Sequence, residues 1–206
     1  MDTGSATAAA AGRREELKAQ NRAKLLSAAR KVFAEKGLGA ATARDIVRET
    51  DLASGTFYNY FDDKNDVFRA LLMELVEKSR DVVRAQRRVP GRSVEERVER
   101  AYLAYFELVL EERELFEVLQ RNVGVAALVA DEQIFEAGIA DLFIDLADWA
   151  AAGDLPAVDL DYLATAMAAV GFQVATHLVN RQAPDAPAAA RFCTRVFMGG
   201  IPALAE

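Results

Sequence analysis

Polar side chains that can bond to nucleic acid are concentrated in one short stretch, residues 54–60. Phe57 and Phe61 are four residues apart, so a helix would place both on one face and the polar side chains on the other. That other face would carry Thr56, Tyr58, Asn59 and Tyr60. Hydroxyl and amide groups bond phosphates and the edges of bases. The alternative is that the two tyrosines are buried, with their hydroxyls satisfied by the protein.

A second short helix is predicted just before this one. Residues 42 to about 50 form a helical pattern in which Ile46 and Val47 supply the apolar face. The turn is residues 51–53, and Ser54 is a residue type that caps helix N-termini. Two short helices joined by a tight turn form a helix-turn-helix, which places its second helix in the major groove of DNA.

The sequence of this region resembles a known family. Residues 54–64 read Ser-Gly-Thr-Phe-Tyr-Asn-Tyr-Phe-Asp-Asp-Lys, and they follow Asp45-Ile46 and a helix that ends Phe33-Ala-Glu-Lys-Gly37. Together they resemble the TetR family of bacterial transcriptional repressors, over roughly residues 22–72. The resemblance implies an all-α homodimer with an N-terminal three-helix DNA-binding domain and a larger helical domain that binds an inducer. Beyond residue 72, only length and helical architecture match.

The resemblance also implies roles for individual residues. Thr42 becomes a phosphate contact, and Arg44 becomes the base-reading arginine, whose fork suits guanine O6 and N7. Tyr60 and Lys64 take positions that contact the DNA backbone. The full predicted set of DNA-binding residues is Thr42, Arg44, Ser54, Thr56, Tyr58, Asn59, Tyr60 and Lys64.

The turn departs from the family's pattern. Where the family commonly carries Ala-Gly-Val-Ser, this chain has Thr50-Asp51-Leu52-Ala53. Asp51 replaces a glycine, and Asp tolerates positive φ better than most residues, so we expect positive φ there. Ala53 removes the usual capping serine, so we expect the cap to move to Ser54.

Charge is distributed unevenly along the 206 residues, whose net charge is −7. Residues 1–50 carry ten Lys and Arg against six Asp and Glu, whereas residues 51–206 carry fifteen against twenty-six. This distribution argues against a protein that coats nucleic acid generally, and it favours a small DNA-facing head on an acidic body. The apolar content of 52% is enough for a sizeable core.

Several classes of chemistry lack the residues they require. With one cysteine, Cys193, and one histidine, His177, the chain offers no intramolecular disulfide and almost no zinc ligands. We expect no metal and no cofactor, and no catalytic set supports an enzyme. Asp141, Asp145 and Asp148 are interpreted as a solvated acidic stripe. No apolar run approaches the roughly 18 residues of a membrane span, and no signal peptide is evident, so a cytoplasmic protein without membrane contact is expected.

The remaining pattern predicts an all-α fold of about nine helices. We divide it into a flexible arm at residues 1–20, a helix-turn-helix domain at 21–65, and a ligand-binding and dimerisation domain at 66–206. The basic run Arg13, Arg14, Lys18 and Arg22 begins a solvated helix or forms an arm along DNA. Family resemblance assigns dimerisation to the last two helices.

A ligand site is expected among the helices of the body. Its candidate residues are Tyr102, Tyr105, Phe106, Phe116, Leu119, Arg121, Asn122, Phe135, Ile139 and Phe143. For each apolar member the alternative is an ordinary core position. An apolar pocket with Arg121 at its mouth favours a fatty acid or acyl-CoA slightly over an aromatic drug-like effector. A constitutive DNA-binding protein without a ligand is the remaining alternative to a ligand-responsive repressor of a palindromic operator.

Overall fold

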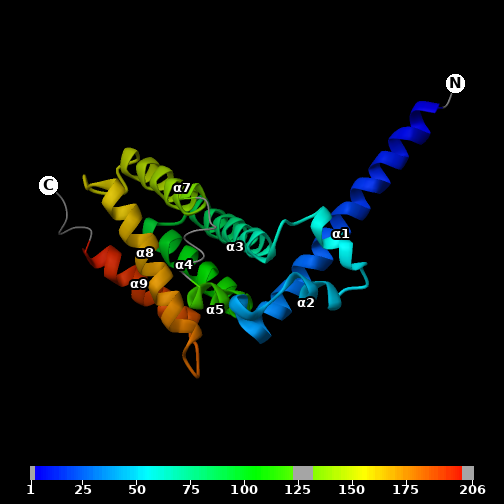
Figure 1. The fold of residues 1–206 in the computed structure, drawn as a ribbon. Coiled ribbons are helices and arrows are strands. Elements are labelled where there is room, and N and C mark those ends of the chain that lie inside the picture. Colours follow the sequence, from blue (N-terminus) through cyan, green and yellow to red (C-terminus); the bar gives the residue numbers. More distant parts are fainter. Residues whose placement is uncertain (1–2, 123–131, 201–206) are drawn as a thin grey trace. The chain divides into compact units, whose positions relative to one another are not determined.

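The computed structural model describes residues 3–122 and 132–200, and the side chains of residues 12–122 and 138–200. Within those residues the chain forms only helices, which confirms the predicted all-α fold of about nine helices (Figure 1). The elements are α1 (Thr3–Ala40), α2 (Ala43–Arg48), the 3-10 helix η1 (Ser54–Asn59), α3 (Lys64–Arg87), α4 (Val94–Glu111), α5 (Arg113–Arg121), α7 (Glu132–Ala151), α8 (Leu160–Val179) and α9 (Ala186–Gly200).

The chain divides into two compact units, which we call the head, Met1–Leu72, and the body, Met73–Glu206. The division falls inside α3, so one continuous helix leaves the head and enters the body. The predicted boundary at residue 65 falls in the first turn of α3, before this division.

The core of the head is built from the apolar face of α1 and the aromatic residues around η1. Phe33 and Phe57 are completely buried, and the ring of Phe33 meets that of Phe68 edge-on at 6.1 Å. Phe57 and Phe61 both point into this core, with ring centroids 5.9 Å apart. Burial of such large aromatic side chains is the main stabilising term for so small a unit.

Helix α1 begins at Thr3, well before the start predicted near Asn21. The expected arm at residues 1–20 is therefore helical from Thr3 onward. The reason is local: this segment is rich in alanine, the residue with the highest helix propensity. At its other end, Gly37 has φ 73°, which interrupts regular helix where the sequence predicts a C-cap.

Four helices of the body pack together: α4 lies against α8 and α9, and α8 also lies against α7. Helix α4 begins with a capping box, in which Ser93 accepts a hydrogen bond from the Glu96 backbone N–H and Glu96 accepts one from that of Ser93. Gly171 allows α8 to approach α4 closely, because a Cβ there would lie 3.0 Å from a ring carbon of Tyr102. Cys193 on α9 is completely buried, as its small apolar character predicts.

Helix α8 is long and apolar enough for a membrane span by length and composition alone: it has 20 residues, and an 18-residue window within it has a mean hydropathy of 1.3. This corrects the sequence-based statement that no apolar run comes close to that length. Its many alanines raise the mean hydropathy although their side chains are small. In the body, α8 buries Leu163, Met167 and Leu178 against its neighbours, as a core helix does.

Candidate nucleic-acid interface

The N-terminus of α2 is fixed by a reciprocal cap. Thr42 accepts a hydrogen bond from the Asp45 backbone N–H at 3.2 Å, and Asp45 accepts from the Thr42 backbone N–H at 3.1 Å. The Thr42 hydroxyl also donates to Asp45 at 2.7 Å, and Lys36 donates to the other carboxylate oxygen at 2.7 Å. The hydrogen bond from Lys36, with those from Thr42, lowers the pKa of Asp45 to about 2. The polar end of α2 is thus held in one geometry.

The turn after α2 is closed by side chains rather than by a left-handed residue. Thr50 donates its hydroxyl hydrogen to the Val47 carbonyl at 2.8 Å and accepts from the Leu52 backbone N–H at 3.2 Å. Lys24 donates to both carboxylate oxygens of Asp51, at 2.9 and 2.8 Å. No residue other than glycine has positive φ in the described chain, so the expectation of positive φ at Asp51 was wrong. The Thr50 bonds shape this turn without such a residue.

The second motif helix is a 3-10 helix rather than an α-helix. Its N-cap is Ala53, which provides no side-chain hydrogen bond. The prediction that Ser54 takes over the cap was wrong, because Ser54 is already the first residue of η1 and lies one position too late. Instead, the Thr56 backbone N–H bonds to the Ala53 carbonyl at 2.8 Å, the short-range pattern of a 3-10 turn.

None of the eight predicted DNA-binding residues is buried. Tyr58 is the most exposed aromatic residue of the motif: its side chain is 66% exposed, and its ring stands edge-on to the buried ring of Phe57. The alternative of two buried tyrosines therefore fails for Tyr58, while Tyr60 is half-buried. The exposed members are Thr42, Arg44, Ser54, Tyr58 and Asn59, and the half-buried ones are Thr56, Tyr60 and Lys64. A buried aromatic face and an exposed polar face are what the four-residue spacing predicts.

Lys64 is held by the protein itself. Its Nζ donates to the carbonyl oxygens of Gly39 and Ala41, at 2.7 and 3.0 Å. A cation is favourable at these carbonyls because they end α1. An ammonium has three donors, so these two bonds leave one for a DNA phosphate. The neighbouring Asp63 caps α3, as predicted, by accepting from the backbone N–H groups of Asn65 and Asp66.

Nine of the ten predicted ligand residues have described side chains, and none of those nine lines either of the two hollows described below. Tyr102 is a core residue: it donates to the Met167 carbonyl at 2.9 Å and stacks on Phe106 and Phe197. Arg121 donates to Glu117, and Asn122 donates to the Val118 carbonyl. Among the rest, Phe106, Phe116 and Leu119 are buried, Tyr105, Ile139 and Phe143 are half-buried, and the side chain of Phe135 lies outside the described residues.

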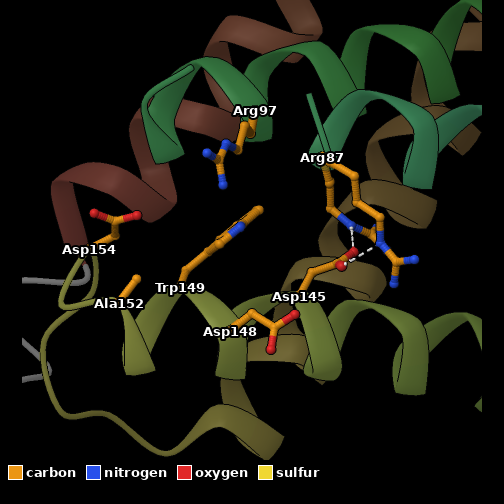
Figure 2. Close-up of a pocket in the computed structure, with 8 residues that line it drawn as sticks. Arg87, Arg97, Asp145, Asp148, Trp149, Ala152 and Asp154 are labelled. Atoms are coloured by element: carbon orange, nitrogen blue, oxygen red, sulfur yellow. Dashed lines mark hydrogen bonds and ion pairs between the residues drawn. The ribbon is translucent and has the colours of Figure 1, made fainter. Parts of the chain in front are cut away.

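Among the described residues of the body, two hollows can be assigned lining residues, and none of those ten is among them. The smaller, about 370 Å³, lies between α3 and α4. The larger, about 530 Å³, lies among the end of α3, the first turns of α4 and the end of α7 (Figure 2). Its lining is mainly charged, with Arg87, Arg88, Arg97, Asp145, Asp148 and Asp154 beside Trp149 and Ala152.

A buried ion pair lies at the edge of the larger hollow. Arg87 Nε donates to Asp145 at 2.6 Å, and Arg88 Nε donates to the other carboxylate oxygen at 3.0 Å. Arg80 and Asp141 pair in the same way at 2.8 Å. The predicted solvated acidic stripe was therefore wrong for Asp141 and Asp145. The sequence did contain a signal for this pairing, because the arginines of α3 recur at the same helical spacing as the aspartates of α7.

The other side of the larger hollow holds an arginine on an indole ring. The guanidinium of Arg97 lies 5.7 Å from the centre of the Trp149 ring, and its Nε is buried without a hydrogen-bond partner. Figure 2 shows these two side chains apart from Arg87 and Asp145. The hollow is therefore lined by equal numbers of arginine and aspartate side chains. The geometry of these side chains best supports a structural role, in which they hold α3, α4 and α7 together.

Known proteins share the motif and the fold. The sequence model described as bacterial regulatory proteins, tetR family, matches residues 25–71. The HTH-type transcriptional repressor KstR2 of Rhodococcus jostii is 39% identical over 70 residues, which are 32% of this chain and 34% of that protein. The match thus spans about a third of the length of this curated relative.

Solved structures extend the likeness to the whole fold. The fatty acid degradation regulator FadR of Bacillus halodurans has a TM-score of 0.75 at 20% identity, over 87% of this chain and 95% of that one. FadR of Bacillus subtilis, solved with stearoyl-CoA, has a TM-score of 0.74 at 20% identity, over 86% and 98%.

The chain has the all-α fold of these solved structures, with a helix-turn-helix near its N-terminus. Residues 25–71, which hold this motif, belong to the TetR family of bacterial regulatory proteins.

Proposed function

We propose that this protein is a dimeric, ligand-responsive repressor that binds a palindromic operator. The observation that carries the proposal is that η1 has two different faces. Aromatic side chains are buried on one face, and Tyr58 and Asn59 are exposed on the other. The capped N-terminus of α2 belongs to the same motif. The relative KstR2 is named a transcriptional repressor, which supports repression rather than activation of transcription.

In this proposal the eight residues divide between reading and positioning. Arg44 reads a base edge, and Ser54, Thr56, Tyr58 and Asn59 face the groove. Thr42, Tyr60 and Lys64 contact phosphates, which fix the protein on the duplex without reading sequence. Because Lys64 also bonds the end of α1, it would join that end to the DNA backbone.

We propose dimerisation through α8 and α9, the last two helices, as the family resemblance implies. Two recognition helices must lie about 34–36 Å apart to read successive turns of DNA. Large apolar side chains on these two helices are exposed in the single chain, namely Tyr162, Phe192 and Val196. Exposed apolar side chains of this size favour a protein contact.

For the effector we propose a fatty acid or an acyl-CoA, bound in the body. The support is the fold shared with FadR, one structure of which holds stearoyl-CoA. The candidate residues named above pack against one another here, so a ligand would have to displace side chains such as Phe116 and Phe172, whose rings lie 5.7 Å apart. An aromatic effector would use the same apolar side chains.

The test is fluorescence anisotropy on the DNA upstream of the protein's own gene, with a duplex selected from a random-sequence pool as a second probe. We expect tight, salt-sensitive binding that acyl-CoAs or fatty acids weaken. Binding that every compound leaves unchanged would favour the constitutive DNA-binding alternative, and the absence of specific binding to either probe would refute the proposal.

Two variants separate base reading from phosphate contact. Arg44→Ala is expected to cost about 1–3 kcal/mol of binding free energy and to relax specificity at one base step. Lys64→Ala is expected to weaken binding to all sequences alike. The exposed Arg100→Ala is a matched control in the body that should leave both properties unchanged.

A further inference from the structure

Helix α1 extends beyond the buried core of the head in a segment that we call the overhang, residues 12–20. Every side chain from Gly12 to Gln20 is exposed, and the first fully buried residue of α1 is Leu25. Its side chains therefore gain little from burial within the head. A helical segment that emerges exposed from a folded unit is available to a partner.

One face of the overhang is basic. Arg14, Lys18 and Arg22 are spaced four residues apart, so they form one stripe along the helix. At about 100° per residue this stripe continues directly into Leu25 and Ala29, which α1 buries against the head. The basic stripe therefore faces the side of α1 on which the rest of the head lies. Of the two acidic residues nearby, Glu16 points to the opposite side and Glu15 lies at the edge of the stripe.

The stripe begins at the end of the helix-turn-helix. The guanidinium of Arg22 lies 5.4 Å from the centre of the Phe61 ring, two residues after the last residue of η1. A helix rises 1.5 Å per residue, which puts Lys18 about 6 Å and Arg14 about 12 Å beyond Arg22. Two further cations thus extend outward from the place where the proposed DNA-reading segment ends.

We infer that the overhang is a second DNA-binding surface, on which Arg14 and Lys18 contact phosphates outside the base pairs read by η1. The inference rests on the proposed function, because it requires DNA seated on η1. Two facts select DNA as the occupant: the stripe is cationic although the chain as a whole carries −7, and it continues the head's candidate DNA-binding surface. Lys and Arg contacts of this kind add affinity without sequence preference.

The test compares full-length wild type with the double variant Arg14→Ala/Lys18→Ala on a fluorescent duplex that wild type selects from a random-sequence pool. Dissociation constants are measured over a series of salt concentrations. Each phosphate contact contributes about 0.9 to the slope of log affinity against log salt, so the slope should fall by about 2 per bound head. Affinity for the selected and for a scrambled duplex should fall by the same factor.

Two controls accompany this measurement. Arg100→Ala/Arg181→Ala removes the same charge from exposed positions of the body and should keep the wild-type slope. Arg14→Lys/Lys18→Arg keeps the charges of the overhang and should do the same. A slope for the alanine variant equal to that of the body control would overturn the inference while leaving the proposed function standing. Failure of wild type to select any duplex would overturn both.

Discussion

Lys24 and Asp51 in the head, and Arg87 and Asp145 in the body, are both short ion pairs, yet they differ in exposure. The head pair has side chains that are 46% and 72% exposed, whereas those of the body pair are 6% and 4% exposed. An exposed pair is screened by water and contributes little. A buried pair is costly to form and far more costly to break. The head therefore uses charge to shape a turn, and the body uses it to hold α3 to α7.

The largest expected effect comes from breaking the buried pair. Asp145→Ala leaves Arg87 buried without its carboxylate and should lower the free energy of unfolding by about 3–5 kcal/mol. Trp149, the single tryptophan, lines the same hollow as the pair, so denaturant unfolding followed by its fluorescence reports on the body.

The exposed ion pair of the head and an apolar replacement of the buried pair provide two controls for this variant. Asp51→Ala in the head should leave unfolding of the body unchanged. The double replacement Arg87→Met/Asp145→Leu should recover most of the lost stability, because apolar residues of similar size often substitute for a buried pair. An Asp145→Ala protein as stable as wild type would show that the two ion pairs are equivalent after all.

A smaller effect is expected at the cap of α2. Thr42→Ala removes the hydroxyl that accepts from the Asp45 backbone N–H and should cost about 1 kcal/mol of stability. Thr42→Ser keeps that hydroxyl and should keep the stability. Thermal unfolding of the two variants, followed by circular dichroism, makes the measurement, and equal melting temperatures would mean that the head does not depend on this cap.

Tyr102 distinguishes a core position from a ligand position. Its hydroxyl donates to the Met167 carbonyl, and burial raises its pKa far above the ordinary value. Tyr102→Phe should therefore cost about 0.5–1.5 kcal/mol of stability. Chemical denaturation measures this cost, with the exposed Tyr58→Phe in the head as the matched control. Unchanged stability together with altered affinity for an acyl-CoA would instead assign Tyr102 to the ligand site.

The smallest effect is a pH dependence confined to acid. The pKa of Asp45 is lowered from 3.8 to about 2 by Lys36 and Thr42, so its carboxylate is stabilised in the folded state. The corresponding stability is fully present above about pH 4 and is lost as the pH falls toward 2. Asp45→Asn should lack this component when melting temperatures are compared between pH 6 and pH 2. A parallel pH dependence in the two proteins would contradict the assignment.

The head was predictable because its signals are local. The caps at Thr42 and Asp63 each depend on residues within three positions, and the Phe57–Phe61 spacing alone decides which side of η1 is buried. Two local predictions failed nearby. Ser54 lay one residue too late to cap, and Asp51 needed no left-handed conformation because Thr50 hydrogen bonds within the turn.

The body was less predictable because its arrangement depends on residues far apart in sequence. Arg87 and Asp145 are 58 positions apart, and the matching spacings of arginine on α3 and aspartate on α7 do not by themselves show that the two helices are neighbours. Tyr102 and Phe116 have the character of pocket residues, but the same aromatic type serves a core equally well. Which of the two roles applies is decided by partners such as Met167 and Phe172 on α8, which helical periodicity cannot identify.

The single buried thiol of Cys193 makes this chain convenient for site-specific labelling. Burial raises the pKa of the thiol to about 11, so little reactive thiolate is present at neutral pH. A cysteine introduced at an exposed position such as Ser54 would therefore react with a maleimide spin label or fluorophore well before the native one. A pair of such labels, one on each subunit of a dimer, would report the distance between the two heads by double electron–electron resonance or by fluorescence resonance energy transfer. Cys193 would not have to be replaced first.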